Sequence, residues 1–493
     1  MTLEDFEKAP RFSLSELQSA TQALWAGKTY EFQSARVWTD TRSIQVGDFF
    51  LPICGQRFDG HDYLQQAFQD GAVGAFVSAE KFAEHPEWVV FQNLLVVSDT
   101  TQAYLDVARF YREGINPKVI AVTGSSGKTS TKEMLFAALS PLKRCVKTEK
   151  NFNNEIGVAQ TMLSLHADTE ILIVEMGMRG PRQIAPLSIA AKPDVAIVIN
   201  VGPAHIEFLG SLKAIATAKL EIAEGLDPAK GVLVINGDSE ELSEGVGRAW
   251  QGQLRSYHLD QAEKLILTST GSSFLYQDGS GQTQEIRLTV PGAHMVANAL
   301  GVLAVGEALG FSVASMVPGL ACFQHAEGRG ETQTLVGFHN VSVINDAYNA
   351  NPQSVQASLE AFLSTYHELQ ETQSQKLVLI LGGMKELGEF SEAYHRALGE
   401  WLSVQKEITA LFIVGEEGRW IYDEILEDFT EDDEGEAALF EIHHVDAVVD
   451  IAKILLSRQD LLENSLLYLK GSRAYALEHL PSLLSTVNTN SKN

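Results

Sequence analysis

Four short, almost wholly apolar runs follow one another in the middle of the chain, and they constrain its fold more than any other feature. They read VIAV (residues 119–122), ILIV (171–174), VAIVI (195–199) and VLVI (232–235). Because apolar and polar residues do not alternate within them, each run is predicted to be a strand buried on both faces. Such strands indicate a mostly parallel sheet covered by helices, and therefore an α/β fold.

A glycine-rich turn follows the first run directly. It reads Thr123-Gly124-Ser125-Ser126-Gly127-Lys128-Thr129, and Ser130 comes next in a segment predicted to be helical. A strand, such a turn and a helix N-terminus place backbone N–H groups around one point, which suits the polyphosphate of ATP or GTP. The turn is shorter than the G-x-x-x-x-G-K-[ST] pattern, because position 122 is Val. The alternative is a Gly-Ser turn that only caps a helix.

Two residues of this turn have specific predicted roles. We expect Lys128 to reach the β- and γ-phosphates and the Thr129 hydroxyl to bind Mg²⁺.

The charge of the chain limits its partners. With 37 Lys and Arg against 64 Asp and Glu, the formal charge is −27, which opposes general affinity for nucleic acid or anionic membranes. The start of the chain has no apolar signal segment, and no run of about 18 apolar residues occurs. We therefore expect a cytoplasmic protein with no membrane insertion. The cysteines, Cys54, Cys145 and Cys322, are odd in number and widely spaced, which favours reduced thiols.

The length of 493 residues predicts three domains. The first block opens with a helix-like segment at residues 13–27, and EGINP at 113–117 is interpreted as a linker. A third block repeats the apolar runs of the second, at residues 341–344, 377–381, 411–414 and 466–469. The predicted domains are a small α/β domain, a central nucleotide-binding parallel sheet and a Rossmann-like C-terminal domain, at residues 1–114, 115–328 and 329–493.

Glycines follow the runs of the third block, at Gly382, Gly383, Gly415 and Gly471. Glycine at the carboxyl ends of parallel strands commonly lines a ligand crevice, although it also serves tight strand-to-helix turns. Lys385, Lys470 and Arg473 lie near the same strand ends. In an acidic protein such cations suit a substrate carboxylate or phosphate, and the alternative for each is an ordinary surface residue.

Two residues at the ends of central strands are candidates for metal binding. Glu175 ends a strand expected to neighbour the phosphate-loop strand, and a carboxylate there can hold Mg²⁺ directly or through water. His205 follows the next apolar run, so it opens on the same edge of the sheet. The alternatives are a capping or salt-bridged Glu and a structural His.

Lys219 stands out within the predicted helix GSLKAIATAKLEIAEGL, residues 210–226. It falls in the middle of the apolar stripe, where a lysine is costly unless paired and where burial lowers its pKa. A neutral amine beside Mg²⁺ could take up CO₂ as a carbamate and become a metal ligand. Ion pairing or an extended side chain with its amine in water is the alternative.

Polar residues in three further segments are candidates for ligand binding. Asn151, Asn153 and Asn154 form an amide-rich loop that is expected to face substrate or the γ-phosphate, or else to be a mere turn. Asn298, in a glycine-led helix at residues 291–305, is a candidate for adenine contacts. Arg329 and Asp346 flank the second domain junction and could close on the nucleotide.

These motifs together resemble the Mur ligase family. In chain order they are TDTR, GDFF, FDGHDYL, TGSSGKTSTKEM, NFNNEIG, VEMGMRG, GPAHIEFLGS, AKLEI, GRGE, DAYNANP, GGMKELGE and KGSR. They span nearly the full chain, and NFNNEIG and DAYNANP are similar to the branch that adds a dipeptide. The resemblance implies an ATP-dependent ligase that joins D-alanyl-D-alanine to UDP-N-acetylmuramoyl-tripeptide through an acyl phosphate in peptidoglycan biosynthesis.

The resemblance also implies roles for individual residues. Lys128, Glu175, His205 and Lys219 would be catalytic, with Thr129, Glu175, His205 and carbamylated Lys219 at Mg²⁺. Asn298, Arg329 and Asp346 would join the phosphate loop in binding ATP. The substrate-binding set would be Asp40, Thr41, Arg42, Asn151, Asn154, Asn349, Asn351, Lys470 and Arg473.

Other functions remain open at this point. One alternative is a related ligase that adds a single amino acid, or glutamate to a folate. Another is a nucleotide-dependent switch without ligase activity. The enzyme is expected to act as a monomer on small-molecule substrates.

Overall fold

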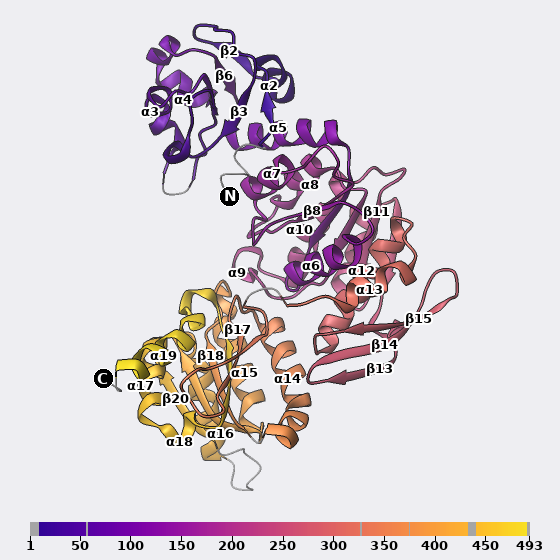
Figure 1. The fold of residues 1–493 in the computed structure, drawn as a ribbon, viewed down its shortest axis with the longest axis vertical. Coiled ribbons are helices and arrows are strands. Elements are labelled where there is room, and N and C mark those ends of the chain that lie inside the picture. Colours follow the sequence, from indigo (N-terminus) through magenta and orange to yellow (C-terminus); the bar gives the residue numbers. More distant parts are fainter. Residues whose placement is uncertain (1–8, 56–57, 326–327, 374, 432–439, 491–493) are drawn as a thin grey trace.

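The computed structural model describes residues 9–55, 58–325, 328–373, 375–431 and 440–490. Within these residues, three six-stranded sheets and one three-stranded sheet form. The first, central and C-terminal units follow one another along the long axis of the molecule (Figure 1). The predicted α/β class is confirmed.

The first unit is a mixed sheet in the order β1-β3-β4-β5-β6-β2. Its inner strands are parallel, and the edge strands β1 and β2 pair antiparallel. The strands are β1 (Arg11–Phe12), β2 (Leu24–Ala26), β3 (Ala35–Trp38), β4 (Phe49–Phe50), β5 (Gly74–Ser78) and β6 (Leu94–Val97). The helices are α2 (Leu14–Thr21), α3 (Leu64–Gln69), α4 (Ala79–Glu84) and α5 (Thr100–Ile115).

Two predictions for the first unit are wrong in part. The helix expected at residues 13–27 ends at Thr21, because Gln22 adopts a left-handed conformation with φ 55°. The expected linker at residues 113–117 is instead the last turn of α5 and the turn that leads into the central sheet. Helix α5 packs against α2 on one side and against helices of the central unit on the other. A continuous helix therefore joins the two units.

The central sheet has the order β12-β11-β10-β7-β9-β8 and is parallel throughout. All four apolar runs of the central block form strands in it. The strands are β7 (Lys118–Thr123), β8 (Cys145–Lys147), β9 (Ile171–Glu175), β10 (Val195–Val198), β11 (Val232–Asn236) and β12 (Gln253–Tyr257).

Helices cover both faces of the central sheet, as the uniform apolar runs require. In β7, Val119 and Ala121 pack into one core while Ile120 and Val122 pack into another. The helices of this unit are α6 (Lys128–Leu139), α7 (Glu155–Leu163), α8 (Ile184–Ala191), α9 (Ile206–Leu209), α10 (Leu212–Leu220), α11 (Glu240–Ala249), α12 (Ala293–Ala308) and α13 (Val313–Ala321).

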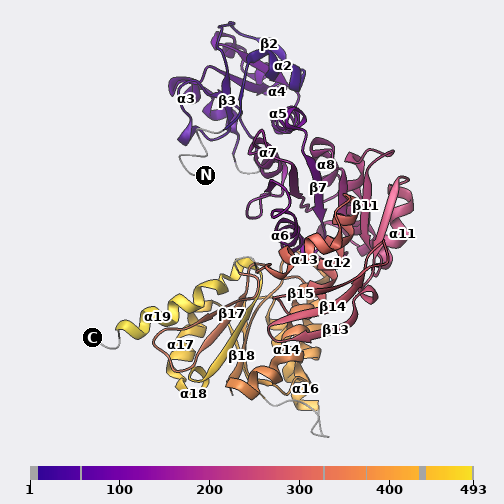
Figure 2. The same cartoon turned by 45° about the vertical axis from the view of Figure 1, so that its right-hand side comes forward.

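A small antiparallel sheet extends the central unit towards the C-terminal one. It comprises β13 (Glu263–Thr268), β14 (Gly271–Gln277) and β15 (Thr283–Leu288). It lies beside α14 (Pro352–Gln373) of the C-terminal unit (Figure 2).

The C-terminal sheet has the order β16-β17-β21-β18-β19-β20 and is parallel except for β16. Its strands are β16 (Glu331–Thr334), β17 (Ser342–Asp346), β18 (Lys376–Gly382), β19 (Ile408–Val414), β20 (Glu441–Val445) and β21 (Ser465–Lys470). Beyond α14, its helices are α15 (Ser391–Ser403), α16 (Arg419–Glu431), α17 (Val448–Ser457), α18 (Gln459–Leu462) and α19 (Leu480–Asn490).

Three of the strand-end glycines, Gly382, Gly383 and Gly415, pack against the Tyr475 side chain. Gly415 has φ 92°, and a Cβ there would lie 2.0 Å from Cε1 of Tyr475. The Tyr475 ring also lies against Gly382 and Gly383. Close packing of this ring therefore explains why these strand ends need glycine.

No helix in the described part of the chain combines the length and the apolar character needed to cross a membrane. The three cysteines are free thiols.

Candidate active site

The phosphate loop joins β7 to α6 at the carboxyl edge of the central sheet. Asn200, just beyond β10, braces it: its Oδ1 accepts hydrogen bonds from the N–H groups of Ser125 and Ser126, both at 3.0 Å. Gly127 has φ 75°, which a residue with a side chain rarely adopts. Lys128 Nζ donates to the Gly124 carbonyl at 2.8 Å, and so closes the loop on itself.

Thr129 and Glu175 lie together as predicted from their strand ends. Because β7 and β9 are adjacent and parallel, Thr129 Oγ1 donates to Glu175 Oε2 at 3.1 Å. Glu175 is 1% exposed. Arg329 Nη2 donates to the same Thr129 hydroxyl at 3.2 Å, so the start of the C-terminal unit reaches the phosphate loop.

Two residues contact Glu175 beside Thr129: Asn153, a candidate from the amide-rich loop, and Lys132, which was not predicted from the sequence. Asn153 Nδ2 donates to Glu175 Oε1 at 2.9 Å. Lys132 is fully buried, with Nζ 3.7 Å from Glu175 Oε2 and 2.7 Å from the Thr148 carbonyl. The signal for Lys132 was its position one helical turn after Lys128, on the same face of α6.

Lys219 is buried in α10, with 2% of its surface exposed. Among the described residues, its Nζ makes no hydrogen bond or ion pair. Burial, and then the charge of nearby Lys128, lower the pKa of Lys219 well below that of an ordinary lysine. Burial likewise lowers the pKa of Lys128, while Glu175 opposes that shift. Two lysines with lowered pKa, Lys128 of α6 and Lys219 of α10, therefore lie near each other.

His205 lies directly before α9, with φ 62°. Its Nδ1 lies against Glu386 Oε2, from the loop after β18. The structure thus pairs His205 with the C-terminal unit, whereas Glu175 pairs with Thr129 and Asn153.

A cavity of about 620 Å³ lies between the central and C-terminal units, within the usual size range for small ligands. Asn298, Arg329 and Asp346 line it together with Ser126, Gly127 and Ser130 of the phosphate loop. Asn298 is buried, and its amide lies 3.9 Å from the Met295 sulfur, a weak acceptor. Its polar atoms are therefore available to a ligand.

Other charged groups also line this cavity. Lys470 Nζ pairs with Asp346 Oδ2 at 2.8 Å, because β21 and β17 are adjacent and parallel. The structure thus places Lys470, predicted to bind substrate, beside the predicted nucleotide residues. His294 lines the cavity too, and burial lowers its pKa to about 4, so the imidazole is neutral near pH 7.

Several predicted substrate residues have structural hydrogen bonds instead of facing the cavity. Asn154 caps α7 through Gly157 N–H at 3.0 Å, and Asn351 Oδ1 accepts from Ser354 N–H at 2.9 Å at the start of α14. Asn151 and Asn349 are exposed.

The remaining predicted substrate residues are surface groups. The Arg473 guanidinium is exposed and lies 5.6 Å from the Tyr348 ring, which Arg329 also contacts. In the first unit, Asp40 accepts hydrogen bonds from Arg42. Asp40 precedes a short helix, Thr41–Ser43, which contains Arg42. The Arg42 side chain is 88% exposed.

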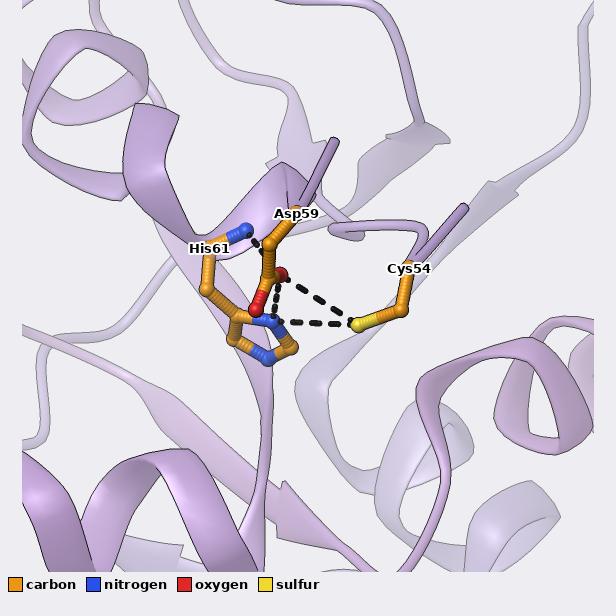
Figure 3. Close-up of side chains that lie close together, drawn as sticks. All are labelled: Cys54, Asp59 and His61. Carbon is orange, nitrogen blue, oxygen red and sulfur yellow. Dashed lines mark hydrogen bonds and ion pairs between the residues drawn. The ribbon is translucent and has the colours of Figure 1, made fainter. Parts of the chain in front are cut away.

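Cys54, Asp59 and His61 form a separate cluster in the first unit (Figure 3). Ser78 N–H donates to His61 Nε2 at 3.0 Å, so Nε2 must accept and Nδ1 must carry the proton in the neutral ring. Nδ1–H then donates to Asp59 Oδ1 at 2.7 Å. Burial, and then Asp59, raise the pKa of Cys54 to about 11. We therefore interpret the cluster as a hydrogen-bond network and not as a metal site.

A ligand-sized cavity closed by two α/β units, with a phosphate loop at its base, is typical of phosphate-loop enzymes that close one domain over a nucleotide. Residues 122–306 match the Mur ligase middle domain, and residues 328–473 match the Mur ligase glutamate ligase domain. The chain belongs to the Mur ligase family.

Relatives and solved structures agree with this assignment. The UDP-N-acetylmuramoyl-tripeptide–D-alanyl-D-alanine ligase of Bacillus subtilis is 33% identical, over 90% of this chain and 92% of its own. The ligase of the same name from Escherichia coli is 32% identical, over 92% and 94%. MurF from Acinetobacter baumannii has a TM-score of 0.83 at 28% identity and covers 97% of this chain and 100% of its own. MurF from Thermotoga maritima, in complex with ADP, gives 0.75 at 26% identity, over 93% and 98%.

Proposed function

We propose that the chain is an ATP-dependent ligase that adds D-alanyl-D-alanine to UDP-N-acetylmuramoyl-tripeptide in peptidoglycan biosynthesis, releasing ADP and phosphate. The relatives from Bacillus subtilis and Escherichia coli are named for this activity, and this chain matches more than nine-tenths of the length of each. The observation that carries the proposal is that Thr129 of the phosphate loop contacts both Glu175 and Arg329. Groups of the central and C-terminal units therefore meet at one hydroxyl.

We assign the nucleotide to the cavity between these units. The polyphosphate would lie on the N–H groups of residues 127–130, at the start of α6, with Lys128, and the base near Asn298 and neutral His294. Arg329 and Asp346 would close on the nucleotide from the C-terminal unit. The ADP complex of the Thermotoga maritima structure supports ATP as the nucleotide.

The oxygen donors beside the loop fit Mg²⁺. Thr129 Oγ1 and Glu175 Oε2 are hard ligands 3.1 Å apart, and small hard cations prefer such donors. Lys219, buried and without a partner among the described residues, would contribute two further oxygens as a carbamate. Mg²⁺ bound there would neutralise phosphate charge. His205 remains a candidate ligand through its other ring nitrogen.

The proposed reaction has two steps, and both need stabilised phosphate charge and a site closed to water. A carboxylate oxygen of the tripeptide attacks the γ-phosphorus, the bond to the bridging oxygen breaks, and ADP leaves. The amine of D-alanyl-D-alanine attacks the carbonyl of the acyl phosphate, loses a proton and displaces phosphate. Lys128 and Arg329 stabilise the transferring charge, and such preorganised contacts each contribute on the order of 10²–10³ in rate. Closure excludes water, which would hydrolyse the acyl phosphate.

The outer units would hold the two substrates. We assign the UDP moiety to the first unit, around Asp40, Thr41 and Arg42, where an exposed guanidinium is held by a carboxylate. We assign the dipeptide to the C-terminal unit, near Asn349 and Arg473. We expect a monomer. ATP and UDP-linked substrates favour the cytoplasm.

Mass spectrometry of the product tests the proposal. The chain is incubated with ATP, Mg²⁺, UDP-N-acetylmuramoyl-tripeptide and one amine donor: D-alanyl-D-alanine, a single amino acid, or glutamate with a folate acceptor. A UDP-pentapeptide formed only with the dipeptide is the expected result. Ligation of another donor would favour a different ligase, and ATP binding without turnover would favour a nucleotide switch.

A further inference from the structure

The loop after β18 makes a contact between the C-terminal and central units that the reaction above does not use. Glu386 lies in this loop. Its Oε2 lies against His205 Nδ1, and its Oε1 lies 3.4 Å from Arg179 Nε. Its carbonyl accepts a hydrogen bond from Glu207 N–H at 3.4 Å. One residue of the C-terminal unit therefore contacts three residues of the central unit.

Both residues of the Glu386–His205 contact have an unfavourable backbone conformation. Glu386 has φ 64° and His205 has φ 62°, in the left-handed region that costs about 1–2 kcal/mol for residues with a side chain. Gly388, two residues on, has φ 53°, and a Cβ there would lie 2.9 Å from Glu207 Cγ. Strained residues persist where their surroundings hold them, and they concentrate at functional sites.

The contact also leaves one ring nitrogen of His205 free. No described residue forms a hydrogen bond or ion pair with Nε2, whereas Nδ1 faces the Glu386 carboxylate. A carboxylate on one ring nitrogen fixes the tautomer and the orientation of the ring, so that the other nitrogen presents a lone pair. The His205 side chain is 24% exposed and that of Glu386 30%, so the pair is partly shielded from solvent.

We propose that Glu386 is a positioning residue: it orients the His205 imidazole, and it does so only when the C-terminal unit is docked on the central unit. The inference rests on the proposed function, in which His205 is a candidate Mg²⁺ ligand through Nε2. Because the orienting carboxylate comes from the other unit, the site is complete only after closure. Acyl phosphate then forms only where water has been excluded.

Glu386→Gln tests this inference, because it removes the charge and keeps the size of the side chain. Glu389→Gln is the matched control: Glu389 lies three residues on in the same loop, is exposed and forms no ion pair with any described residue. We expect Glu386→Gln to lower kcat by about 10–100-fold, the usual range for a partner that orients a ligand, with the KM for ATP changed less than about threefold. Glu389→Gln is expected to match the wild type.

A second measurement needs neither substrate nor metal. Two-bond ¹⁵N–¹H spectra of the metal-free chain, with the His205 signals assigned through His205→Gln, report which ring nitrogen is protonated. We expect a proton fixed on Nδ1 in the wild type and in Glu389→Gln, and a mixture of tautomers in Glu386→Gln. Unchanged His205 signals in Glu386→Gln, or unchanged kcat, would overturn the inference. Failure of the proposed function would show instead as absence of ligation by the wild type.

Discussion

Replacing Asn200 with alanine removes the side chain that braces the phosphate loop. Besides the two bonds to Oδ1, its Nδ2 donates to the carbonyl and the hydroxyl of Ser126, at 3.2 and 3.0 Å. Ser125 N–H retains the Asn200 carbonyl as an acceptor at 3.2 Å, whereas Ser126 N–H retains none among the described residues. A neutral hydrogen bond contributes about 1 kcal/mol, and the substitution removes four such bonds. The variant is therefore expected to lose about 2–4 kcal/mol of unfolding free energy.

Urea unfolding of the full chain measures this loss, and calorimetric titration with ADP measures its effect on the loop. If re-forming the loop uses about 1.4 kcal/mol of the binding energy, ADP affinity falls about tenfold. Asn236→Ala is the control for stability: Asn236 ends the adjacent strand β11, and its Oδ1 accepts only an exposed bond, from Asp238 N–H at 2.9 Å. It is expected to lose less than about 1 kcal/mol. Equal losses in the two variants, with ADP affinity unchanged in Asn200→Ala, would refute the reasoning.

Three further predictions concern Lys219, the asparagines of the amide-rich loop, and Lys470. Burial lowers the pKa of Lys219 in the folded chain, so the unfolded chain binds more protons between the two pKa values and stability rises with pH there. In CO₂-depleted buffer, Lys219→Met should remove up to about 1.4 kcal/mol per pH unit from that slope, measured by urea unfolding at a series of pH values. Asn153→Ala should lower turnover because its amide orients the strand-end carboxylate, whereas Asn154→Ala should cost about 1 kcal/mol of stability as a lost helix cap and leave phosphate release unchanged. Lys470→Met leaves Asp346 without its cation and should destabilise the chain by about 3 kcal/mol, partly restored by adding Asp346→Asn. An equal dependence of stability on pH in the wild type and in Lys219→Met would contradict the first prediction. Equal turnover of Asn153→Ala and Asn154→Ala would contradict the second, and wild-type stability of Lys470→Met would contradict the third.

The central and C-terminal sheets could be predicted because burial on both faces leaves a strong pattern in the sequence. Every apolar run in residues 119–235 forms a parallel strand. The three-stranded sheet β13–β15 escaped prediction because its strands mix polar and apolar residues and are partly exposed. The linker prediction failed because Gly114 lies in the last turn of α5, where it meets no neighbour and a glycine is tolerated.

Strand ends predicted part of the site, because parallel strands place their carboxyl ends on one edge. The positions of the strand ends predicted that Glu175 lies near Thr129. The place of Lys219 in an apolar stripe predicted that it is buried. The sequence could not decide which asparagine of the amide-rich loop faces Glu175: the start of α7 takes Asn154 as its cap, and this leaves Asn153 for the site. The contact of His205 with Glu386 depends on the docking of two units, which no local pattern encodes.

Transfer of oxygen from substrate to phosphate tests the central claim most directly, namely that the chain transfers the γ-phosphoryl group of ATP to a substrate carboxylate. The UDP-tripeptide is labelled with ¹⁸O in its terminal carboxylate and ligated with ATP and D-alanyl-D-alanine, and the released phosphate is analysed by mass spectrometry. We predict one ¹⁸O atom in each phosphate, because the bond to carbon breaks when the amine displaces phosphate. Ligated product accompanied by unlabelled phosphate, or by labelled AMP, would contradict the account.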